Sequence, residues 1–400
     1  MAEHRFPPGF LFGVSTAAHQ IEGANTNSNW WAIEHHPSSH VAEPSGDAAD
    51  SFHRWGEDLD LVAELGFNAY RFSIEWARIE PAPGELSYAA LAHYRAMIDG
   101  ALERGIEPVV TLHHFTEPRW VTDAGSWADA ESVDRFVGYV ERAVGILDGV
   151  RYVATINEPN ILGVMARVMH LGSGGDDPDR DRDIPTAPLP APHLASEVNV
   201  IAAHHSARDA IKAARPDLQV GWTVASQVIS AVPGGEDTAA AFADLVEDRY
   251  LRESTGDDWV GVQSYTRNVF GPDGFIRDDP EDTRTLTGWE YWPTAVGEAL
   301  RHTAGIVGDV PMIVTENGIA TDDDERRIAY TDGALSSVRA ALDDGLDVRG
   351  YLHWSLLDNY EWGSYTPTFG LVAVDRETFR RTVKPSARWL GGIGRGIPSA

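Results

Sequence analysis

The stretch RYVATINEPN (151–160) reads as a short apolar strand that ends in Glu158, with Pro159 directly behind it. A charged side chain at the end of a buried strand costs free energy unless it is paired or useful, and proline prevents the strand from continuing. A second stretch, MIVTENG (312–318), follows the same plan and places Glu316 at its end. Two such strands suggest two carboxylates that face one site.

Six other segments have the same nearly continuous apolar character, which is expected of parallel strands that are covered on both faces. With the two stretches above, the expected strands cover residues 10–17, 69–76, 108–115, 152–159, 219–226, 259–266, 312–318 and 348–356. Segments with helical spacing lie between most of them, and Gly66 and Gly105 are natural helix stops. The expected helices cover residues 51–66, 87–105, 130–148, 193–215, 236–253, 293–305 and 325–345.

The repeated order of strand and helix predicts an α/β fold of the (β/α)8 TIM-barrel type. No linker-like break divides the chain, so we expect residues 1–400 to form a single domain. Two polar stretches, residues 172–192 and 271–288, are expected to be long loops that elaborate the βα connections.

Composition excludes several classes of site. The apolar fraction of 43% is ample for a large core, and the absence of cysteine excludes disulfides and thiolate metal sites. The amino-terminal residues lack a basic region followed by an apolar run, and no apolar run reaches the ~18–20 residues of a membrane span. We therefore expect a cytoplasmic protein without a membrane partner.

The chain is strongly acidic, with a formal net charge of -29. This charge would repel nucleic acid and anionic lipid, so neither is an expected partner. Lys212 and Lys384 are the two lysines among 32 basic residues. The charge is typical of a well-solvated surface and does not indicate a reaction.

Polar and aromatic side chains gather at the expected carboxyl ends of the strands, where a barrel of this type carries its active site. They are Gln20, Arg71, Glu75, His114, Asn157, Glu158, Gln263, Tyr265, Glu316 and Trp354. Rings stack on sugars, amides and carboxylates pair with hydroxyl groups, and two carboxylates are the usual equipment for cleaving a glycosidic bond. No Gly-rich phosphate loop follows a strand and no metal ligands cluster, so we expect neither a cofactor nor a metal.

Structural interpretations of the same residues stay open. A lone glutamate in a turn is more often a helix cap or an ion-pair partner than a catalyst, and Arg71 and Glu75 could form a buried ion pair. Three pairs of adjacent histidines lack the spacing of a zinc-binding helix. The pair at residues 204–205 lies within an expected helix, where packing is the simpler role. The other two pairs are at residues 35–36 and 113–114. The catalytic hypothesis rests on the strand-end positions taken together.

A series of ordered motifs spans nearly the whole chain. They are FLFGVSTAAHQIEG (10–23), YRFSIEWARIEPAPGE (70–85), TINEPN (155–160), VTENG (314–318), WSLLDNYEWGSY (354–365), FGLVAVD (369–375) and KPSARWL (384–390). In these motifs and their spacing the chain resembles the family 1 glycoside hydrolases, the family of β-glucosidases and β-galactosidases. The resemblance implies a retaining β-glycosidase on a (β/α)8 barrel.

By matching position, the resemblance implies that Glu158 is the general acid/base and Glu316 the nucleophile. The acid must keep its proton near neutral pH, which requires a raised pKa. The nucleophile must stay ionised, and Arg71 and Tyr265 are suitable partners for its charge. Once the covalent intermediate has formed, the charge of Glu316 is gone, so Glu158 can ionise and act as a base toward water.

The resemblance also implies which residues bind the sugar. Asn157 would bind the 2-hydroxyl, Trp354 would be the stacking floor, and Glu361 would bind the 4- and 6-hydroxyls. The other substrate-binding residues would be Gln20, His114, Phe115, Gln263, Tyr265, Trp362 and Phe369. A non-proline cis peptide is expected between Trp354 and Ser355.

The chain departs from the family pattern at four points. Phe115 stands where tryptophan is common, Gln263 where asparagine is usual, and Asn160 where an aromatic aglycone contact is frequent. The chain is also shorter than many members. Gln263 could move Tyr265 or the contacts of the nucleophile, and the aglycone pocket could differ in shape and in its aromatic walls.

The predicted function is a retaining β-glycosidase that removes the terminal non-reducing β-D-glycosyl residue of a small-molecule β-glycoside. A β-glucosidase is the first choice, with β-galactosidase or β-fucosidase activity as further options. Two alternatives stay open, a 6-phospho-β-glycosidase and a non-catalytic sugar-binding barrel. Glu361 argues against the first, because phosphate-specific relatives carry serine there, and the presence of both Glu158 and Glu316 argues against the second. The natural aglycone, transglycosylation and the oligomeric state stay open.

Overall fold

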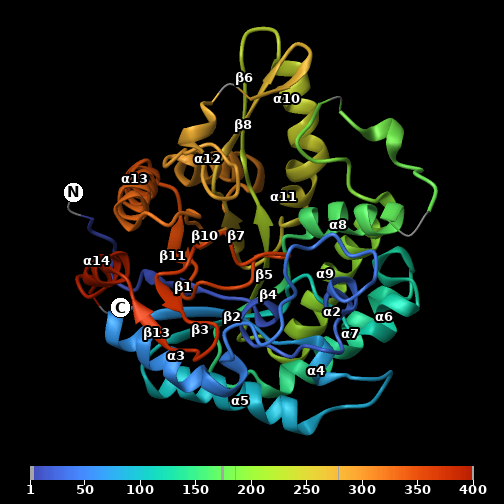
Figure 1. Ribbon diagram of the computed structural model, residues 1–400, viewed down its shortest axis with the longest axis vertical. Coiled ribbons are helices and arrows are strands. Elements are labelled where there is room, and N and C mark those ends of the chain that lie inside the picture. Colours follow the sequence, from blue (N-terminus) through green and yellow to red (C-terminus); the bar gives the residue numbers. More distant parts are fainter. Residues whose placement is uncertain (1–3, 173–174, 185, 278, 399–400) are drawn as a thin grey trace.

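Eight parallel strands form a closed barrel at the centre of the computed structural model, which describes residues 4–172, 175–184, 186–277 and 279–398 (Figure 1). The strands follow the order β1-β11-β10-β7-β5-β4-β3-β2 around the barrel. Their bounds are β1 (Leu11–Ser15), β2 (Ala69–Ser73), β3 (Glu107–His113), β4 (Tyr152–Asn157), β5 (Gln219–Ala225), β7 (Val260–Gln263), β10 (Met312–Glu316) and β11 (Val348–Trp354). Each falls on one of the eight expected segments, so the predicted (β/α)8 barrel is confirmed.

The first strand closes the barrel. β1 pairs in parallel with both β2 and β11, which places Ser15 beside Arg71 on one side and beside Trp354 on the other. Every residue of β1, β2 and β10 is buried, as expected for strands that are covered on both faces. The register therefore brings the carboxyl ends of strands far apart in the sequence to one end of the barrel.

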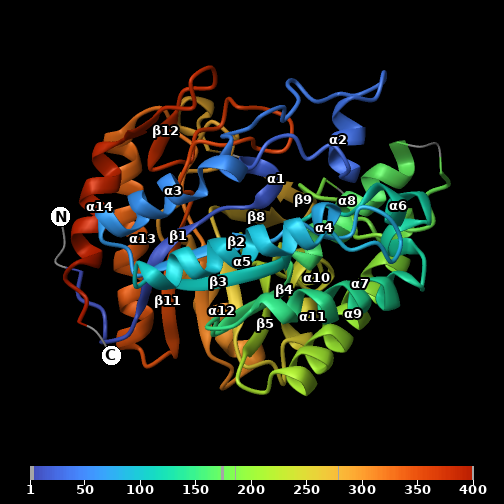
Figure 2. The same ribbon diagram turned by 90° about the horizontal axis from the view of Figure 1, so that it is seen from below.

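Helices surround the barrel and cover its outer face (Figure 2). The seven expected helical segments correspond to α3 (Ser51–Leu65), α5 (Tyr88–Glu103), α7 (Ser132–Ala143), α9 (Leu194–Ala214), α10 (Glu236–Ala243) with α11 (Arg249–Glu253), α12 (Ala295–Val307) and α13 (Asp324–Asp343). The predicted stop at Gly66 is confirmed, because this residue caps α3 with a φ of +95°, a conformation that favours glycine.

Several short elements lie outside the expected pattern. The additional α-helices are α1 (Ala18–Ile21), α2 (Asn29–Glu34), α4 (Trp76–Ile79), α6 (Arg119–Asp123), α8 (Pro159–Gly172) and α14 (Pro385–Gly394). Single 3-10 turns are η1 (Ser126–Ala128), η2 (Val144–Ile146), η3 (Arg180–Arg182) and η5 (Glu281–Thr283). Most of these elements are too short to show a helical period in the sequence.

Two expectations about the region after β5 are corrected. The expected helix at 236–253 is interrupted by η4 (Asp244–Asp248), a π-helical turn between α10 and α11. The expected loop at 271–288 contains a strand, although its position 278 lies outside the described residues. This strand, β9 (Gly274–Ile276), joins β6 (Val228–Ala231) and β8 (Arg267–Gly271) in a small sheet that stands beside α10 (Figure 1).

A second small sheet lies near the carboxyl terminus. Its strands β12 (Val372–Val374) and β13 (Arg381–Val383) pair in antiparallel fashion. The backbone amide of Gly9 donates to the carbonyl of Pro398 at 3.1 Å, so the two described ends of the chain meet. Among the described residues, no helix combines the length and the apolar character that crossing a bilayer requires.

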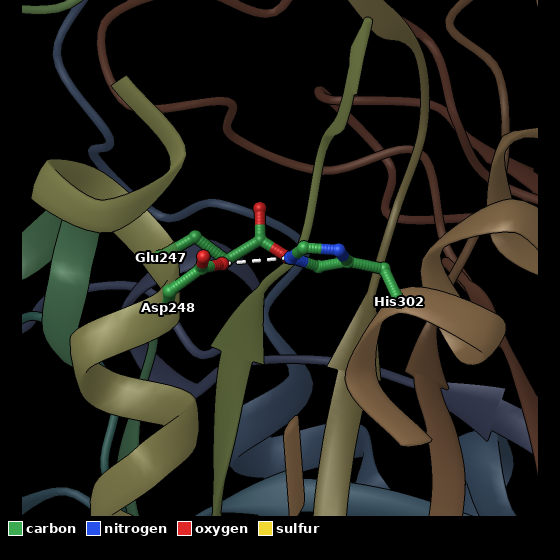
Figure 3. A group of neighbouring side chains, drawn as sticks. All are labelled: Glu247, Asp248 and His302. Carbon is green, nitrogen blue, oxygen red and sulfur yellow. Dashed lines mark hydrogen bonds and ion pairs between the residues drawn. The ribbon is translucent and has the colours of Figure 1, made fainter. Parts of the chain in front are cut away.

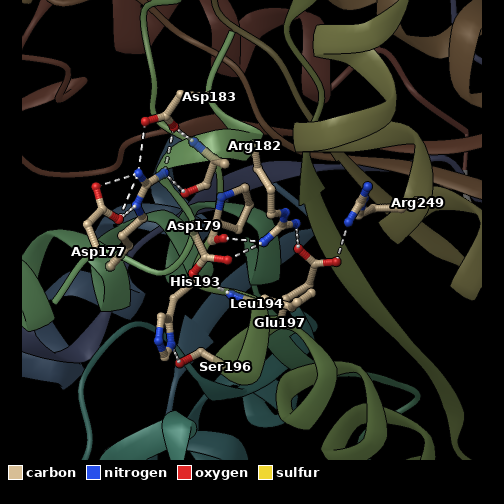
Figure 4. Close-up of polar contacts among 12 residues, drawn as sticks. Asp177, Asp179, Arg182, Asp183, His193, Leu194, Ser196, Glu197 and Arg249 are labelled. Atoms are coloured by element: carbon tan, nitrogen blue, oxygen red, sulfur yellow. Dashed lines mark hydrogen bonds and ion pairs between the residues drawn. The ribbon is translucent and has the colours of Figure 1, made fainter.

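Ion pairs hold the polar connection that follows α8. Arg167 is nearly fully buried and contacts Asp177 at 2.9 Å and Asp183 at 2.6 Å. Arg182 contacts Glu197 of α9 at 2.9 Å (Figure 4). Apart from positions 173, 174 and 185, which lie outside the described residues, the connection is a loop with one 3-10 turn, as expected.

Candidate active site

The predicted catalytic glutamates lie at the carboxyl ends of two strands. Asn157 ends β4 and is followed directly by Glu158, and Glu316 is the last residue of β10. Pro159 begins α8, which explains why the strand cannot continue. The backbone amide of Glu158 donates to the carbonyl of Thr223 on β5 at 2.7 Å, which fixes the start of this turn.

Arg71 connects several strand ends beneath the site. Its guanidinium donates to Oε1 of Glu316 at 2.5 Å, to Oδ1 of Asn157 at 2.5 Å and to Oγ1 of Thr111 at 3.0 Å. Arginine suits this position because its planar fork of donors can serve several acceptors at once. The guanidinium thus ties β2 to β3, β4 and β10.

The suggested ion pair between Arg71 and Glu75 is wrong. Glu75 instead accepts hydrogen bonds from the Thr116 hydroxyl at 2.7 Å and from the backbone amide of Ala77 at 3.0 Å, and so caps α4. Burial raises the pKa of Glu75 to about 7. Arg71 therefore contacts Glu316 instead, while Glu75 has the structural role of a helix cap.

A tyrosine completes the surroundings of Glu316. The Tyr265 hydroxyl donates to Oε2 of Glu316 at 2.6 Å, so the two carboxylate oxygens have separate partners. Gln263 donates to Oδ1 of Asn157 at 3.0 Å. The longer arm of Gln263 therefore reaches across to β4, and Tyr265 keeps its contact with Glu316.

The two glutamates differ in how strongly they hold a proton. Burial, reinforced by the charge of Glu316, raises the pKa of Glu158 well above its usual range. Burial also raises the pKa of Glu316, but Arg71 and the Tyr265 hydroxyl oppose this rise with hydrogen bonds. Glu316 is therefore the group that ionises first, and Glu158 retains its proton.

Aromatic rings line one wall of the site. His114 stacks nearly parallel to Trp354, with ring centroids 5.9 Å apart, and to Trp362 at 6.1 Å. Phe115 meets Trp362 edge-on at 5.1 Å. Burial holds the pKa of His114 well below its usual value, so its ring is neutral. A neutral imidazole among aromatic rings fits the recognition of an uncharged polyol.

Glu361 lies at the same wall. Its Oε1 accepts from the indole nitrogen of Trp354 at 3.1 Å, and its Oε2 from the amide of Gln20 on α1 at 3.3 Å. Burial raises the pKa of Glu361 to about 8. Trp354 and Ser355 are joined by a non-proline cis peptide, as the resemblance implies.

Three of the predicted site residues have an unusual backbone conformation. Phe115, Glu158 and Trp362 have φ values of +67°, +43° and +51°. Such left-handed conformations are rare for non-glycine residues and cluster at functional sites. They turn the side chains away from the strand direction, and no feature of the sequence announces them.

Sequence reasoning missed two neighbours of the site. The Thr223 hydroxyl on β5 donates to Asn157 at 3.0 Å, although no side chain of this strand was predicted to contribute. A polar residue within the apolar run of β5 is the signal that could have found it. Trp289 packs against Tyr265 at 5.5 Å and Phe369 at 6.3 Å, but it lies between an expected loop and an expected helix and was assigned to neither.

Asn160 does not extend toward the site as an aglycone contact would. Its amide nitrogen donates to the carbonyls of Ala225 and Val246, both at 2.9 Å, and the residue is buried. Asn160 thereby links the start of α8 to the end of β5 and to η4.

His204 and His113, which belong to two of the three histidine pairs, serve packing rather than a shared ligand. His204 stacks on Trp222 with ring centroids 4.1 Å apart and contacts Asp257 at 3.1 Å, which agrees with the packing role expected within α9. His113 is buried edge-on against Trp127. Among the described residues, one group of three metal-ligating side chains exists, and it contains none of these histidines.

Comparisons with known proteins agree with this geometry. The model of "Glycosyl hydrolase family 1" matches residues 2–252 and 261–395. β-Glucosidase A of Thermotoga maritima is 31% identical over 97% of each chain, and the alignment has 448 positions, more than this chain has residues. The expectation that this chain is shorter than many members stays a prediction.

Two further similarities cover almost the whole chain. A bifunctional β-D-glucosidase/β-D-fucosidase of Bifidobacterium breve is 32% identical over 96% of this chain and 97% of its own. The crystal structure of β-glycosidase BGL167 is 44% identical, covers 99% of this chain and 98% of its own, and superposes with a TM-score of 0.88.

Proposed function

The chain belongs to glycosyl hydrolase family 1, and from this premise we propose that it is a β-glucosidase with Glu316 as nucleophile and Glu158 as acid/base. The main support for the proposal is that the carboxyl groups of Glu316 and Glu158 have different surroundings. Arg71 and Tyr265 bind Glu316 at 2.5 and 2.6 Å, whereas burial and the charge of Glu316 keep Glu158 protonated. Such a pair of acid and anion is what retaining hydrolysis of a glycoside requires.

In the first step, the ionised Glu316 attacks the anomeric carbon while Glu158 gives its proton to the departing oxygen. The negative charge of Glu316 disappears in the covalent intermediate, so one cause of the raised pKa of Glu158 is removed. Glu158 then takes a proton from water, which attacks the same carbon and releases a β-sugar. No further group is needed for proton transfer.

The sugar is proposed to lie between the aromatic wall and the amides. Trp354 supplies a stacking surface, and Asn157 faces the 2-hydroxyl, with its oxygen occupied by Arg71 and its amide nitrogen 3.3 Å from His114 Nε2. Gln20 and Glu361 bind the far hydroxyls, and Phe115, Gln263, Trp362 and Phe369 complete the pocket. The relative with both glucosidase and fucosidase activity supports tolerance at the 4- and 6-positions, because D-fucose differs from D-glucose at both.

We also propose that residues 1–400 form one catalytic domain, since β1 and β11, from the two ends of the chain, close the same barrel. The substrate is a small-molecule β-glycoside, and the net charge of -29 disfavours nucleic acid as a partner. A cytoplasmic location is supported by the lack of cysteine, which fits a reducing compartment.

The main rival is a barrel of the same family that binds sugar without cleaving it. A chromogenic aryl β-glucoside separates the two, because hydrolysis releases the coloured aglycone. We expect turnover with the glucoside. Binding of the glucoside without release of the aglycone would contradict the proposed function, and a panel of galactosides and fucosides would then rank the sugars for an active enzyme.

The stereochemical course tests the roles of the two carboxyls. For a retaining pair we expect the carboxyl groups of Glu158 and Glu316 to lie about 5–5.5 Å apart in a crystal structure with a bound inhibitor. NMR of the first-formed product should show the β-anomer from a β-substrate. A first-formed α-anomer, or a separation of about 9 Å, would indicate inversion.

We predict a strong preference for the unphosphorylated sugar because of Glu361. Two sugar hydroxyls can donate to this carboxyl and favour its ionised form, whereas a 6-phosphate, with a charge of about -1.5 to -2 at pH 7, would meet a buried acid. The kcat/KM for nitrophenyl glucoside should exceed that for its 6-phosphate by at least about 100-fold, since burying an unpaired charge costs several kcal/mol.

The matching variant is Glu361→Ser, which should raise KM for the glucoside and lower the ratio of the two specificity constants. No lysine is available to bind a phosphate, because Lys384 is already paired with Asp358 at 2.7 Å and Lys212 contacts Asp258 on the outside of the barrel. A wild-type ratio that favours the phosphorylated substrate would overturn the assignment of Glu361.

A further inference from the structure

Three side chains that can bind a metal converge on the outside of the barrel, away from the proposed catalytic residues. Glu247 and Asp248 belong to the π-helical turn η4, and His302 lies on the facing helix α12 (Figure 3). One oxygen of each carboxylate and one nitrogen of the imidazole all lie within 4.8 Å of one another. π-Helical turns are rare and are frequent at functional sites.

The spacing of these atoms is close to that of a coordination shell. Nε2 of His302 lies 2.7 Å from Oδ1 of Asp248 and 4.0 Å from Oε1 of Glu247. Ligands about 2.0–2.1 Å from a tetrahedral zinc ion are roughly 3.3 Å apart. The two observed separations bracket this value, so small rotations of the partly exposed side chains of His302 and Asp248 would complete the geometry.

The burial of Glu247 and its unpaired carboxylate oxygen are a second, independent indication of a bound ligand. Its side chain is 1% exposed, and its Oε1, the atom that faces His302, has no hydrogen-bond partner among the described residues. Ser226 and the backbone amide of Gln227 lie close to the same carboxyl group and counteract part of the rise in its pKa. A buried oxygen without a partner is costly, and these outer contacts are of the kind that orient a metal ligand.

We propose that Glu247, Asp248 and His302 bind one divalent transition-metal ion, with Zn²⁺ as the best match. Imidazole nitrogen and carboxylate oxygen are both ordinary zinc ligands, and three protein ligands leave a position for water. The side chain of His302 is 44% exposed, so the ion can enter directly from solvent.

The bound ion would connect η4 to α12. The turn η4 is already held from its other side, because the amide of Asn160 donates to the carbonyl of Val246. The ion would therefore brace the outer wall behind the start of α8, and it would take no part in the reaction. We expect Zn²⁺ to raise the melting temperature of the folded protein and a chelator to reverse the increase.

The test is a calorimetric titration of ZnCl₂ into the chelator-treated full-length protein at neutral pH, with the variants His302→Ala and Glu247→Gln. We expect one site in the wild type and at least a tenfold loss of affinity in each variant. His302 is partly exposed, so its replacement should leave the fold intact, and circular dichroism would verify this for both variants.

The matched control is His53→Ala. His53 contacts Asp50 at 2.7 Å, the same distance as in the proposed site, but this pair belongs to no group of three ligands in the described part of the chain. Its loss should leave zinc affinity unchanged. The proposal is overturned if wild-type protein binds no Zn²⁺, if His302→Ala binds as wild type does, or if Glu247→Gln retains full affinity, since the last result would leave a simple histidine-aspartate pair.

Discussion

Replacement of Glu316 by glycine should reduce hydrolysis of a nitrophenyl β-glucoside by at least about four orders of magnitude, because no covalent intermediate can form. Arg71 and Tyr265, which each hold one oxygen of Glu316, would remain and leave an empty space beside the anomeric carbon. An α-glycosyl fluoride mimics the missing intermediate and should fit this space. Initial rates by absorbance give the first result, and product analysis with an acceptor sugar gives the second.

The synthesis assay with the α-fluoride is the control for the hydrolysis assay. Formation of β-glycosides from the α-fluoride by Glu316→Gly would prove that the variant is folded and that Glu158 still acts as a base. Loss of hydrolysis is then due to the missing nucleophile. Substantial hydrolysis of the glucoside in a preparation free of wild-type enzyme would show that the nucleophile is another residue.

The variant Glu158→Ala should lose most activity on substrates whose leaving group must be protonated, and least on substrates whose leaving group departs as an anion. General acid catalysis contributes about 10²–10⁴-fold, so an alkyl glucoside should suffer a loss of this size in the first step. A dinitrophenyl glucoside, whose aglycone leaves without protonation, should still form the intermediate rapidly. Azide should then restore turnover, since it attacks without help from a base, and the product should be a β-glycosyl azide.

The pH profile gives a second measure of Glu158. Its raised pKa means that the required protonated form persists above the usual range of a glutamate and is lost as pH rises through the raised value. The kcat/KM of the wild type should fall on this alkaline side, and the fall should be absent in Glu158→Ala with the dinitrophenyl substrate. Equal losses with alkyl and dinitrophenyl glycosides would refute the acid role.

The barrel and the predicted catalytic pair could be read from the sequence because both depend on local pattern. Buried parallel strands are continuous apolar runs, and Glu158 and Glu316 interrupt two such runs at their ends. The parallel register then brings these ends together without any further information. Glu361 lies in an irregular segment after β11, where no strand pattern marks it. Its role was therefore predicted from the resemblance alone.

The rest depends on contacts that a linear pattern does not contain. Read as residues alone, Arg71 could have paired with Glu75, and only the catalytic hypothesis paired it with Glu316, which lies 245 residues further along the chain and which the guanidinium does contact. The small sheet of β6, β8 and β9 was missed because three- to five-residue strands in a polar region carry no clear period. The sequence also gave no sign that residues of η4 and α12 would face each other.

The side chain of Asn160 bears on how far this enzyme could be re-engineered at its acceptor side. Its three hydrogen bonds, to Ala225 N and O and to Val246 O, occupy the position where the family often carries an aromatic ring. A ring introduced there alone would remove one donor from each of two carbonyls and would have to displace η4. A change at residue 160 therefore has to be combined with a change in the π-helical turn, and we expect libraries that vary this position alone to contain mostly destabilised proteins.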